Sequence, residues 1–278
     1  MLEKNRLITA SLVLYNTNSK DLDNVIKSVL NSPIDRLYII DNSPSNQLAD
    51  VIDLYNSNCI EYYHGQGNIG FGRANNIGIR KAILLGAQYH IVLNPDIIFE
   101  HNVITELERY MSAHHDVGMI LPRVVYPNGR LQFLCKLLPT PLDIFGRRVF
   151  PRKWIEKKNY KYEMHFFGYD KIWNCPILSG CFMFLRVSSL KDVGVFDDRF
   201  FMYFEDFDLM RRIHEKYKTI FYPFVSIIHN HAAEHRTNYK LLLESIKSAI
   251  KYFNKWGWFY DPQRRYINNN ALKSNIID

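Results

Sequence analysis

Three carboxylates within four residues form a feature of the sequence that could do chemistry. Glu205, Asp206 and Asp208 directly follow the apolar and aromatic run 200–204. At the start of a helix such side chains complement the helix dipole, but a cap needs one carboxylate and no aromatic packing before it. A desolvated acidic cluster is more often a proton acceptor or a cation site. The cluster therefore predicts a proton acceptor or a cation site, with a helix start as the alternative.

A second candidate is Asp96, which follows the apolar, strand-like run 89–93. Because Pro95 cannot donate to a sheet ladder, it should end that strand and place Asp96 just past the carboxyl end. Ligands of open α/β sheets bind at this edge. Asp41 occupies an equivalent place after the run 36–40. Both carboxylates are therefore expected at a ligand-binding edge, although Asp96 could equally cap the next helix.

The elements that must position these carboxylates alternate between strand and helix. Short apolar runs predict buried strands, and apolar positions at helical spacing predict helices. This alternation favours a mostly parallel sheet flanked by helices, an α/β fold. Strands are expected at 7–14, 36–40, 60–63, 89–93, 117–122, 220–223 and 226–228, and helices near 21–30, 47–55, 73–85, 101–112, 187–193 and 209–216.

A glycine-rich stretch, 65–70, matches G-x-G-x-x-G literally. The dinucleotide-binding fingerprint belongs in the first strand-turn-helix unit and needs an acidic residue about 20 positions further on. Here two complete units precede the motif, and His90 stands where the acid should be. We therefore interpret 65–72 as a loop that lets the backbone approach a ligand closely, or as a tight turn alone.

The composition is that of an ordinary globular protein. With 278 residues and 47% hydrophobic content, the chain can bury the core of one large domain, or of one domain with an appendage. The four cysteines form no C-x-x-C pair, which favours free thiols in a reduced, cytosolic compartment. No run reaches the roughly 20 apolar residues of a membrane span, and the run 7–14 is too short for a secretory signal.

The net charge of +7 is concentrated in two basic regions, 147–161 and 240–278. Such charge indicates an anionic partner: nucleic acid, a phosphate-bearing substrate or a membrane surface. The stretch 255–260 interleaves a lysine with Trp, Phe and Tyr. It could lie in a membrane interface or pack as an aromatic helix on the main domain. Between 136 and 171 periodicity fades, which predicts a long surface excursion that is functional or mobile.

Taken in chain order, these features resemble family 2 glycosyltransferases, and most closely their rhamnosyltransferase and galactofuranosyltransferase branch. The similarity extends over about 7–231 and leaves out 136–171 and the C-terminal residues. The ordered series is specific, although each motif alone is not. It comprises Tyr15-Asn16, Ile39-Ile40-Asp41-Asn42-Ser43, Asn68-Ile69-Gly70-Phe71-Gly72, Asn75-Asn76, Leu93-Asn94-Pro95-Asp96, Leu178-Ser179-Gly180, Gly194-Val195-Phe196-Asp197, Phe204-Glu205-Asp206-Phe207-Asp208-Leu209 and His229.

The resemblance implies a GT-A fold with a C-terminal helical extension, an inverting reaction and a nucleotide-sugar donor. Asp96 matches the last residue of the family's D-x-D motif and would bind a divalent cation, Mg²⁺ or Mn²⁺, that bridges the donor diphosphate. The first Asp of that motif is Asn94 here, so the cation has one firm carboxylate ligand. His229 matches a histidine that can complete the metal site.

The remaining site residues carried over from the family fall into three groups. Asp206 matches the catalytic base, with Glu205 and Asp208 as supports. Acceptor binding is implied for Ser179, Gly180 and Cys181, with 136–171 as a candidate acceptor loop. Donor binding is implied for Val13, Tyr15, Asp41, Asn68, Gly70, Arg73, Asn75 and Asn94, where Asp41 would accept from a ring N–H of the pyrimidine base. The domains implied are 1–235, catalytic, and 236–278, a basic and aromatic extension.

The branch resemblance favours dTDP-rhamnose as the donor, with UDP-galactofuranose or another UDP-hexose as the alternative. The implied acceptor is a lipid-diphosphate-linked saccharide of bacterial O-antigen or capsule assembly. The protein would act in the cytoplasm, free or peripherally bound to the inner face of the cytoplasmic membrane. A catalytically silent sugar-binding or scaffold subunit competes with this interpretation, but the full set of matching carboxylates opposes it. A nucleic-acid partner is not expected, because the basic regions lie outside the motif-bearing core and lack a reading motif.

Overall fold

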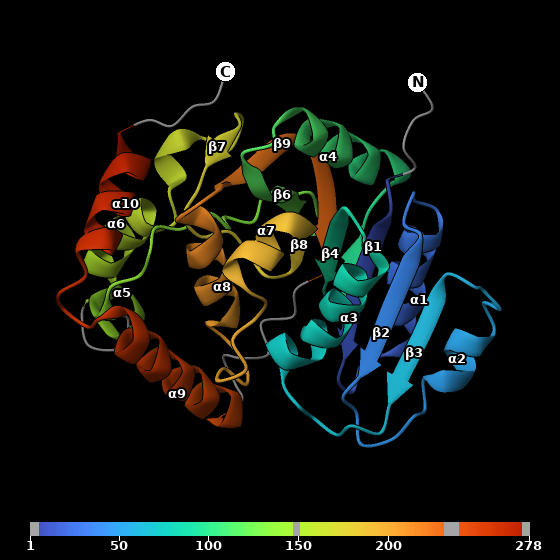
Figure 1. Cartoon of the computed structure of the whole chain (residues 1–278). Helices are drawn as coiled ribbons and strands as arrows, with labels where there is room; N and C mark the ends of the chain where they lie inside the picture. Colours follow the sequence, from blue (N-terminus) through green and yellow to red (C-terminus); the bar gives the residue numbers. More distant parts are fainter. Residues whose placement is uncertain (1–5, 147–150, 231–238, 274–278) are drawn as a thin grey trace.

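The computed structural model of the chain describes residues 6–146, 151–230 and 239–273. Within them a nine-stranded sheet runs in the order β3-β2-β1-β4-β8-β6-β9-β5, and β7 pairs with β9 outside this path (Figure 1). Its strands are β1 (Ile8–Leu14), β2 (Arg36–Asp41), β3 (Ile60–His64), β4 (Tyr89–Leu93), β5 (Ile97–Ile98), β6 (Val117–Val125), β7 (Trp173–Asn174), β8 (Phe182–Arg186) and β9 (Lys218–His229).

The predicted α/β fold is confirmed, and the sheet is mixed. The strands β1 to β4 pair in parallel, as do β6 and β9. The strand β8 lies between β4 and β6 and runs antiparallel to both, while β5 and β7 pair antiparallel with β9. A buried apolar run looks the same in either direction, so the sequence pattern did not contain the orientation of β8.

Helices cover both faces of the parallel half, because alternate strand residues point to opposite faces. In β1, Leu12 joins the cluster that contains Val25 of α1, whereas Val13 packs in the cluster that contains Ala74 of α3. The helices are α1 (Ser19–Leu30), α2 (Ala49–Asp53), α3 (Phe71–Leu85), α4 (His101–Ala113), α5 (Pro141–Phe145), α6 (Arg152–Tyr162), α7 (Val187–Val193), α8 (Glu205–His214), α9 (Tyr239–Trp256) and α10 (Pro262–Leu272), with a 3₁₀ turn η2 (His165–Phe167).

Two segments differ from their sequence patterns. The two short strands expected at 220–223 and 226–228 form one strand, β9, and its register against β6 shifts between Pro122 and Arg123. Pro223 lacks an N–H for the ladder, which accounts for a bulge at this point. The segment 136–171 contains α5 and α6 and buries aromatic side chains, including Tyr169, whose hydroxyl donates to the carbonyl oxygen of Glu163 at 3.0 Å. The buried aromatic residues of this segment do not recur at helix or strand spacing, so the sequence shows no periodic pattern there.

The C-terminal helices pack on the rest of the chain. Tyr252 and Phe253 of α9 form a buried cluster with Phe200 and Phe204, which precede α8. Ahead of α10, both oxygens of Asp261 accept hydrogen bonds from the buried Arg211 guanidinium, at 2.7 and 2.9 Å. Of the two alternatives for this aromatic region, packing on the main domain is therefore found. None of the helices in the described residues has the length and apolar character to cross a membrane.

Candidate active site

The start of α8 places Asp206 against the loop before β8. Tyr203 and Phe204 both adopt left-handed backbone angles, with φ of +66° and +65°. Such angles cost about 1–3 kcal/mol each in non-glycine residues and cluster at functional sites. They turn the chain so that a Cβ added to Gly180 would lie 3.0 Å from Asp206 Oδ2. A glycine at 180 is therefore what allows the carboxylate to approach this loop.

Burial acts on both carboxylates at this helix start. It raises the pKa of Glu205 well above the usual range, and the neighbouring charge of Asp206 adds to this effect. Burial also raises the pKa of Asp206, but the N–H of Phe207, 2.9 Å from Oδ1, and the positive charge of Lys136 both act in the opposite direction. Glu205 Oε2 is buried and has no hydrogen-bond partner among the described residues. The Phe207 N–H and the charge of Lys136 thus favour the ionised form of Asp206, the form in which a general base acts.

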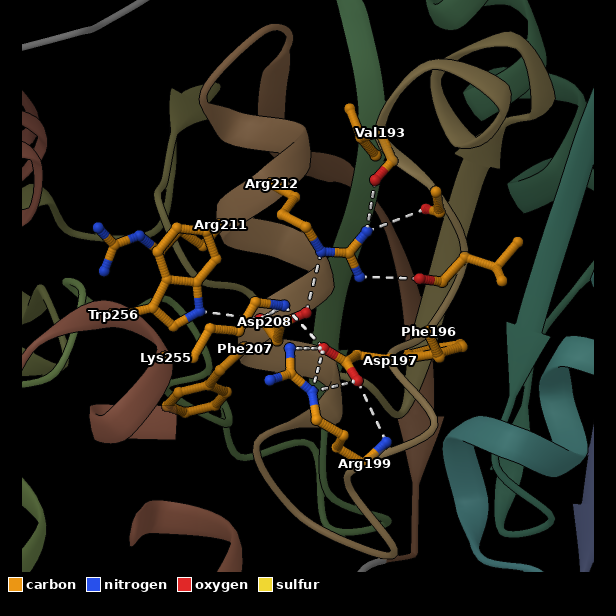
Figure 2. A network of polar contacts seen from close by, with 12 residues as sticks. Val193, Phe196, Asp197, Arg199, Phe207, Asp208, Arg211, Arg212, Lys255 and Trp256 are labelled. Carbon is orange, nitrogen blue, oxygen red and sulfur yellow. Dashed lines mark hydrogen bonds and ion pairs between the residues drawn. The ribbon is translucent and has the colours of Figure 1, made fainter. Parts of the chain in front are cut away.

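Asp208 plays a different part from Asp206, and Figure 2 shows its surroundings. Its side chain is fully buried. Oδ1 accepts a hydrogen bond from Trp256 Nε1 at 2.8 Å and lies 2.7 Å from Lys255 Nζ, while Oδ2 accepts from Arg212 Nε at 2.9 Å. Both oxygens are thus held by α8 itself and by α9. Asp208 therefore fixes the start of α8, the helix that carries Asp206, against α9.

The loop before α8 is held by two further anchors. Asn76 of α3 donates to the carbonyl oxygen of Phe196 at 2.9 Å and accepts from its N–H at 3.0 Å. Asp197 forms a bidentate ion pair with Arg199, and its carboxylate also lies 2.8 Å from Lys255 Nζ (Figure 2). These contacts hold the pKa of Asp197 well below its usual range. Lys255 therefore joins the loop and the helix start through one ammonium group.

The two predicted metal residues lie side by side. Because Ile97 pairs with His229 across β5 and β9, Asp96 Oδ2 comes within 3.3 Å of His229 Nε2. Gln132 fixes the imidazole: its amide nitrogen donates to the carbonyl oxygen of His229 at 2.9 Å, so its oxygen, 3.0 Å from Nδ1, accepts the ring proton. In the neutral ring the lone pair of Nε2 then points toward a carboxylate oxygen. A positive charge between these two atoms, a metal ion or the proton of a protonated ring, would stabilise this contact.

A divalent cation fits this pair. Donor atoms that occupy neighbouring positions around an ion, each about 2.0–2.2 Å from it, lie about 3 Å apart. Within the described residues there is no group of three or more His, Cys, Asp or Glu side chains that could hold a metal. Asp96 also lines a cavity of about 490 Å³ together with Lys20, Asn24 and Asn230. Asp96 and His229 would supply two ligands to such a cation, and a bound diphosphate could supply others, as is usual for Mg²⁺.

Some of the predicted donor residues are exposed to solvent and others are buried. Tyr15 is 54% exposed after β1, and Arg73 is exposed on α3. Asp41 is buried at the end of β2, where it accepts from the Ser43 N–H and from the Tyr62 hydroxyl, each at 2.9 Å. Each carboxylate oxygen keeps a second lone pair for a ligand donor.

Three further predicted donor residues make contacts within the protein. Asn75 is fully buried, and its side-chain oxygen accepts from Ser11 Oγ at 2.6 Å, so it ties α3 to β1 rather than facing a ligand. Gly70 has φ of +87°, and an added Cβ would lie 2.2 Å from the carbonyl oxygen of Phe201. Asn68 accepts from the Gly70 N–H at 3.2 Å. The close approach at Gly70 is therefore to the segment that precedes α8.

The predicted acceptor residues lie between the two acidic sites. Cys181 is buried, and burial together with the charges of Asp96 and Asp206 raises the pKa of its thiol to about 12. Its carbonyl oxygen accepts from the Asn94 N–H at 2.9 Å. One residue at the start of β8 therefore lies near both carboxylates, which are 110 positions apart in the sequence. Ser179 and Gly180 are partly exposed at the same place.

Sequence reasoning missed three residues that the geometry brings to the site. Lys136 places its ammonium group 5.7 Å from the ring centre of Phe207, beside Asp206. Gln132 orients His229, and Lys255 bridges Asp197 and Asp208. None belongs to a recognisable motif. The only signal was the basic and aromatic character of the stretch around Lys255.

Solved structures with similar folds are glycosyltransferases. The crystal structure of GalNAc-T7 with UDP, GalNAc and Mn²⁺ superimposes with a TM-score of 0.65 and 16% identity, over 90% of this chain and 48% of that one. The structure of S. aureus TarS gives a TM-score of 0.58 and 14% identity, over 96% of this chain and 43% of that one. The chain thus spans about half the length of these structures. At this level of identity they define the fold, which is GT-A.

The sequence comparisons define the family. A model of "Glycosyl transferase family 2" matches residues 11–194, and the chain belongs to this family. A hexosyltransferase of low-salt glycan biosynthesis, Agl10 of Haloferax volcanii, is 24% identical over 274 residues, which cover 96% of this chain and 78% of that protein. An N-acetylglucosaminyl-diphospho-decaprenol L-rhamnosyltransferase of Mycobacterium tuberculosis is 28% identical over 236 residues, which cover 76% and 73%. The matched range ends before Asp206 and His229, so their roles depend on the geometry.

Proposed function

We propose that the protein transfers a hexose from a nucleotide-diphosphate sugar to a hydroxyl of a saccharide acceptor, with inversion at the anomeric carbon. Asp206 accepts the proton of the attacking hydroxyl. Asp96 and His229 hold Mg²⁺ or Mn²⁺, which when bound neutralises charge on the departing diphosphate. The observation that carries this proposal is the position of residues 180 and 181. The Cys181 carbonyl oxygen accepts from the Asn94 N–H at 2.9 Å on the Asp96 side, and a Cβ at Gly180 would lie 3.0 Å from Asp206 Oδ2 on the base side.

Asp206 suits its proposed role because it keeps a negative charge in a partly buried place. The Phe207 N–H and Lys136 favour the ionised form, while burial makes the carboxylate more basic than in water. Burial and the neighbouring charge of Asp206 favour the neutral form of Glu205, which adds no second charge that would repel an electron-rich hydroxyl. Asp41 and Tyr15, at the ends of β2 and β1, are the proposed contacts for the nucleotide base.

The proposed donor is dTDP-rhamnose, and UDP-galactofuranose or another UDP-hexose is the alternative. The L-rhamnosyltransferase of M. tuberculosis and the hexosyltransferase of H. volcanii support a hexose donor. The name of the first also supports a lipid-diphosphate-linked acceptor, as in the assembly of a bacterial O-antigen or capsule. Such an acceptor would place the protein in the cytoplasm at the inner face of the membrane.

A nucleotide-release assay tests the proposal. The full chain is incubated with Mn²⁺, a lipid-diphosphate saccharide, and dTDP-rhamnose, UDP-galactofuranose or UDP-hexoses in turn. We expect one donor to give release that depends on both acceptor and cation. Asp206→Asn should abolish transfer while donor binding, measured by calorimetry, stays within about twofold; Asp50→Asn, at an exposed position on α2, serves as the control. Turnover retained in Asp206→Asn would refute its role as the base.

A further inference from the structure

Helix α6 presents a row of lysines to solvent. Lys153, Lys157 and Lys161 are exposed and follow one another at intervals of four residues, so they lie along one side of the helix. Like charges at this spacing destabilise a helix slightly. None of the three has an acidic partner at ion-pair distance among the described side chains. The three lysines therefore concentrate positive charge on one side of α6, although alternating positive and negative side chains would make the helix more stable.

The loop before α10 brings exposed aromatic residues to this basic row. Phe259, Tyr260 and Tyr266 are 91%, 85% and 68% exposed. Together with Lys161 and Arg265 these aromatic residues line one cavity of about 730 Å³. The loop, α6 and α10 are therefore neighbours, and Figure 1 shows the two helices side by side. Large aromatic side chains exposed in water beside cations are typical of a surface that contacts a membrane interface.

The other charges that line this cavity have partners within the protein. Lys158 lies 3.1 Å from Asp143, and Asp261 accepts from Arg211 at 2.7 Å. Arg264 is buried and donates to the carbonyl oxygens of Pro139 and Trp258, at 3.3 and 3.1 Å. What remains directed to solvent at the rim is positive, from Lys161 and Arg265. The complementary partner is an extended anionic surface, not a single buried ion.

We propose that this basic-aromatic face, defined as Lys153, Lys157, Lys161, Arg265, Phe259 and Tyr260, docks the protein on an anionic lipid surface. The cations attract the headgroups, and the two aromatic rings at the loop enter the interface. The proposal deepens the proposed function, because a lipid-linked acceptor would be met at such a surface. It locates docking on α6 and the loop before α10, while α9 stays packed on the catalytic helix.

Co-sedimentation with vesicles tests the charged part of this face. The full chain is mixed with phosphatidylcholine vesicles that contain 30% phosphatidylglycerol, or none, at low and at physiological ionic strength. We expect salt-sensitive binding to the anionic vesicles and little to the neutral ones. Lys161→Glu/Arg265→Glu should weaken binding at least about tenfold. The control Arg80→Glu/Lys191→Glu reverses two exposed charges outside the face and should bind like the unmodified protein.

The aromatic part is tested in the same assay. Phe259→Ser/Tyr260→Ser should weaken binding to anionic vesicles at least about fivefold, since each ring supplies apolar area to the interface. Leu54→Ser/Leu84→Ser removes two side chains that are 84% and 86% exposed elsewhere and should have no effect. Equal binding of neutral and anionic vesicles would overturn the proposal, as would unchanged binding of both face variants. All four variants alter exposed side chains, so thermal unfolding should confirm that each is folded.

The docking proposal and the proposed function can fail separately. Nucleotide release with a water-soluble acceptor needs no vesicle, so it reports on the active site alone, and Phe259→Ser/Tyr260→Ser, outside the candidate acceptor loop 136–171, should retain it. If the unmodified protein releases nucleotide but binds no vesicles, docking is wrong and the transfer stands. If it binds anionic vesicles through this face but releases nucleotide from no donor, the proposed transfer is wrong and docking stands.

Discussion

Lys255 Nζ lies 2.7 Å from Asp208 Oδ1 and 2.8 Å from Asp197 Oδ2, and so connects α9 to both ends of the segment that leads into the catalytic helix. The same helix supports that segment twice more: Ser248 donates to the carbonyl oxygen of Met202 at 2.7 Å, and Lys251 Nζ donates to that of Arg199 at 2.6 Å. The left-handed residues before α8 are therefore held in place from the C-terminal side of the chain.

Replacing Lys255 by Met should lower the free energy of unfolding by about 2–3 kcal/mol, because it leaves the buried Asp208 carboxylate with one cation fewer. The loss is below that of a fully enclosed pair, since a fifth of the Lys255 side chain is exposed. Because α8 carries Asp206, kcat should also fall about tenfold with little change in KM. Urea denaturation and steady-state kinetics measure the two effects.

The matched control for this change is Lys247→Met, also on α9, whose partner Glu244 is at the surface. An exposed pair of this kind contributes less than about 1 kcal/mol. Lys255→Arg should recover part of both losses, because it keeps the positive charge. If Lys255→Met proved no less stable than Lys247→Met, the bridge would not support the helix.

Lys136 should set the pH dependence of the reaction. Burial raises the pKa of Asp206, whereas the N–H groups of Phe207 and Gly180 and the charge of Lys136 lower it, and the carboxyl of Glu205 lies beside it. Removing the ammonium in Lys136→Met should raise the pKa of Asp206 further. A general base works only when deprotonated, so activity is lost as the pH falls through its pKa. The acid limb of kcat/KM should therefore move to higher pH, by about one unit.

The pH profile of Lys191→Met, at an exposed position on α7, gives the comparison for this measurement. Donor affinity at a pH above the acid limb should be similar in all three proteins. A limb that stays in place when Lys136 is replaced would show that its charge does not reach the base.

The sequence predicted those structural features that depend on neighbouring residues in the chain. The strands β1, β2 and β4 were predicted within about one residue, because a buried parallel strand is a continuous apolar run. The direction of β8, and the pairing that brings His229 to Asp96, arise from contacts between distant parts of the chain. No local pattern of residues predicts such contacts. The proximity of His229 to Asp96 was expected only from the resemblance to a family.

The candidate site shows the same limit. The position of Asp206 at a helix start follows from local sequence, and the structure confirms that helix. That Asn75 is enclosed in the core, and that Gln132 lies against His229, depends on which faces of α3 and β9 pack inward. A motif match shows that a residue type is retained at a position, and it does not separate a contact with a ligand from a contact with the fold.

Gln132 should control the affinity for a divalent cation. Its side-chain oxygen lies 3.0 Å from Nδ1 of His229, and accepting the ring proton there directs the Nε2 lone pair toward Asp96. Gln132→Leu removes this hydrogen bond and should weaken Mn²⁺ binding in the presence of UDP about 10- to 100-fold. Calorimetric titration measures the change, and Asp96→Ala, which removes a proposed ligand, should abolish binding. Full affinity in Gln132→Leu would contradict the orienting role, and full affinity in Asp96→Ala would contradict the site.

Gly70 offers a comparison between two glycines that share a left-handed backbone. An added Cβ at Gly70 would lie 2.2 Å from the carbonyl oxygen of Phe201, whereas at Gly65, with φ of +96°, nothing lies within 4 Å. Gly65→Ala should therefore cost only the backbone strain, about 1–2 kcal/mol. Gly70→Ala must also displace the segment before α8, so it should lower the free energy of unfolding by about 3 kcal/mol or more and reduce kcat through Asp206. Equal losses in the two variants would mean that the segment before α8 yields easily, and that its close contact with Gly70 does not hold the base in position.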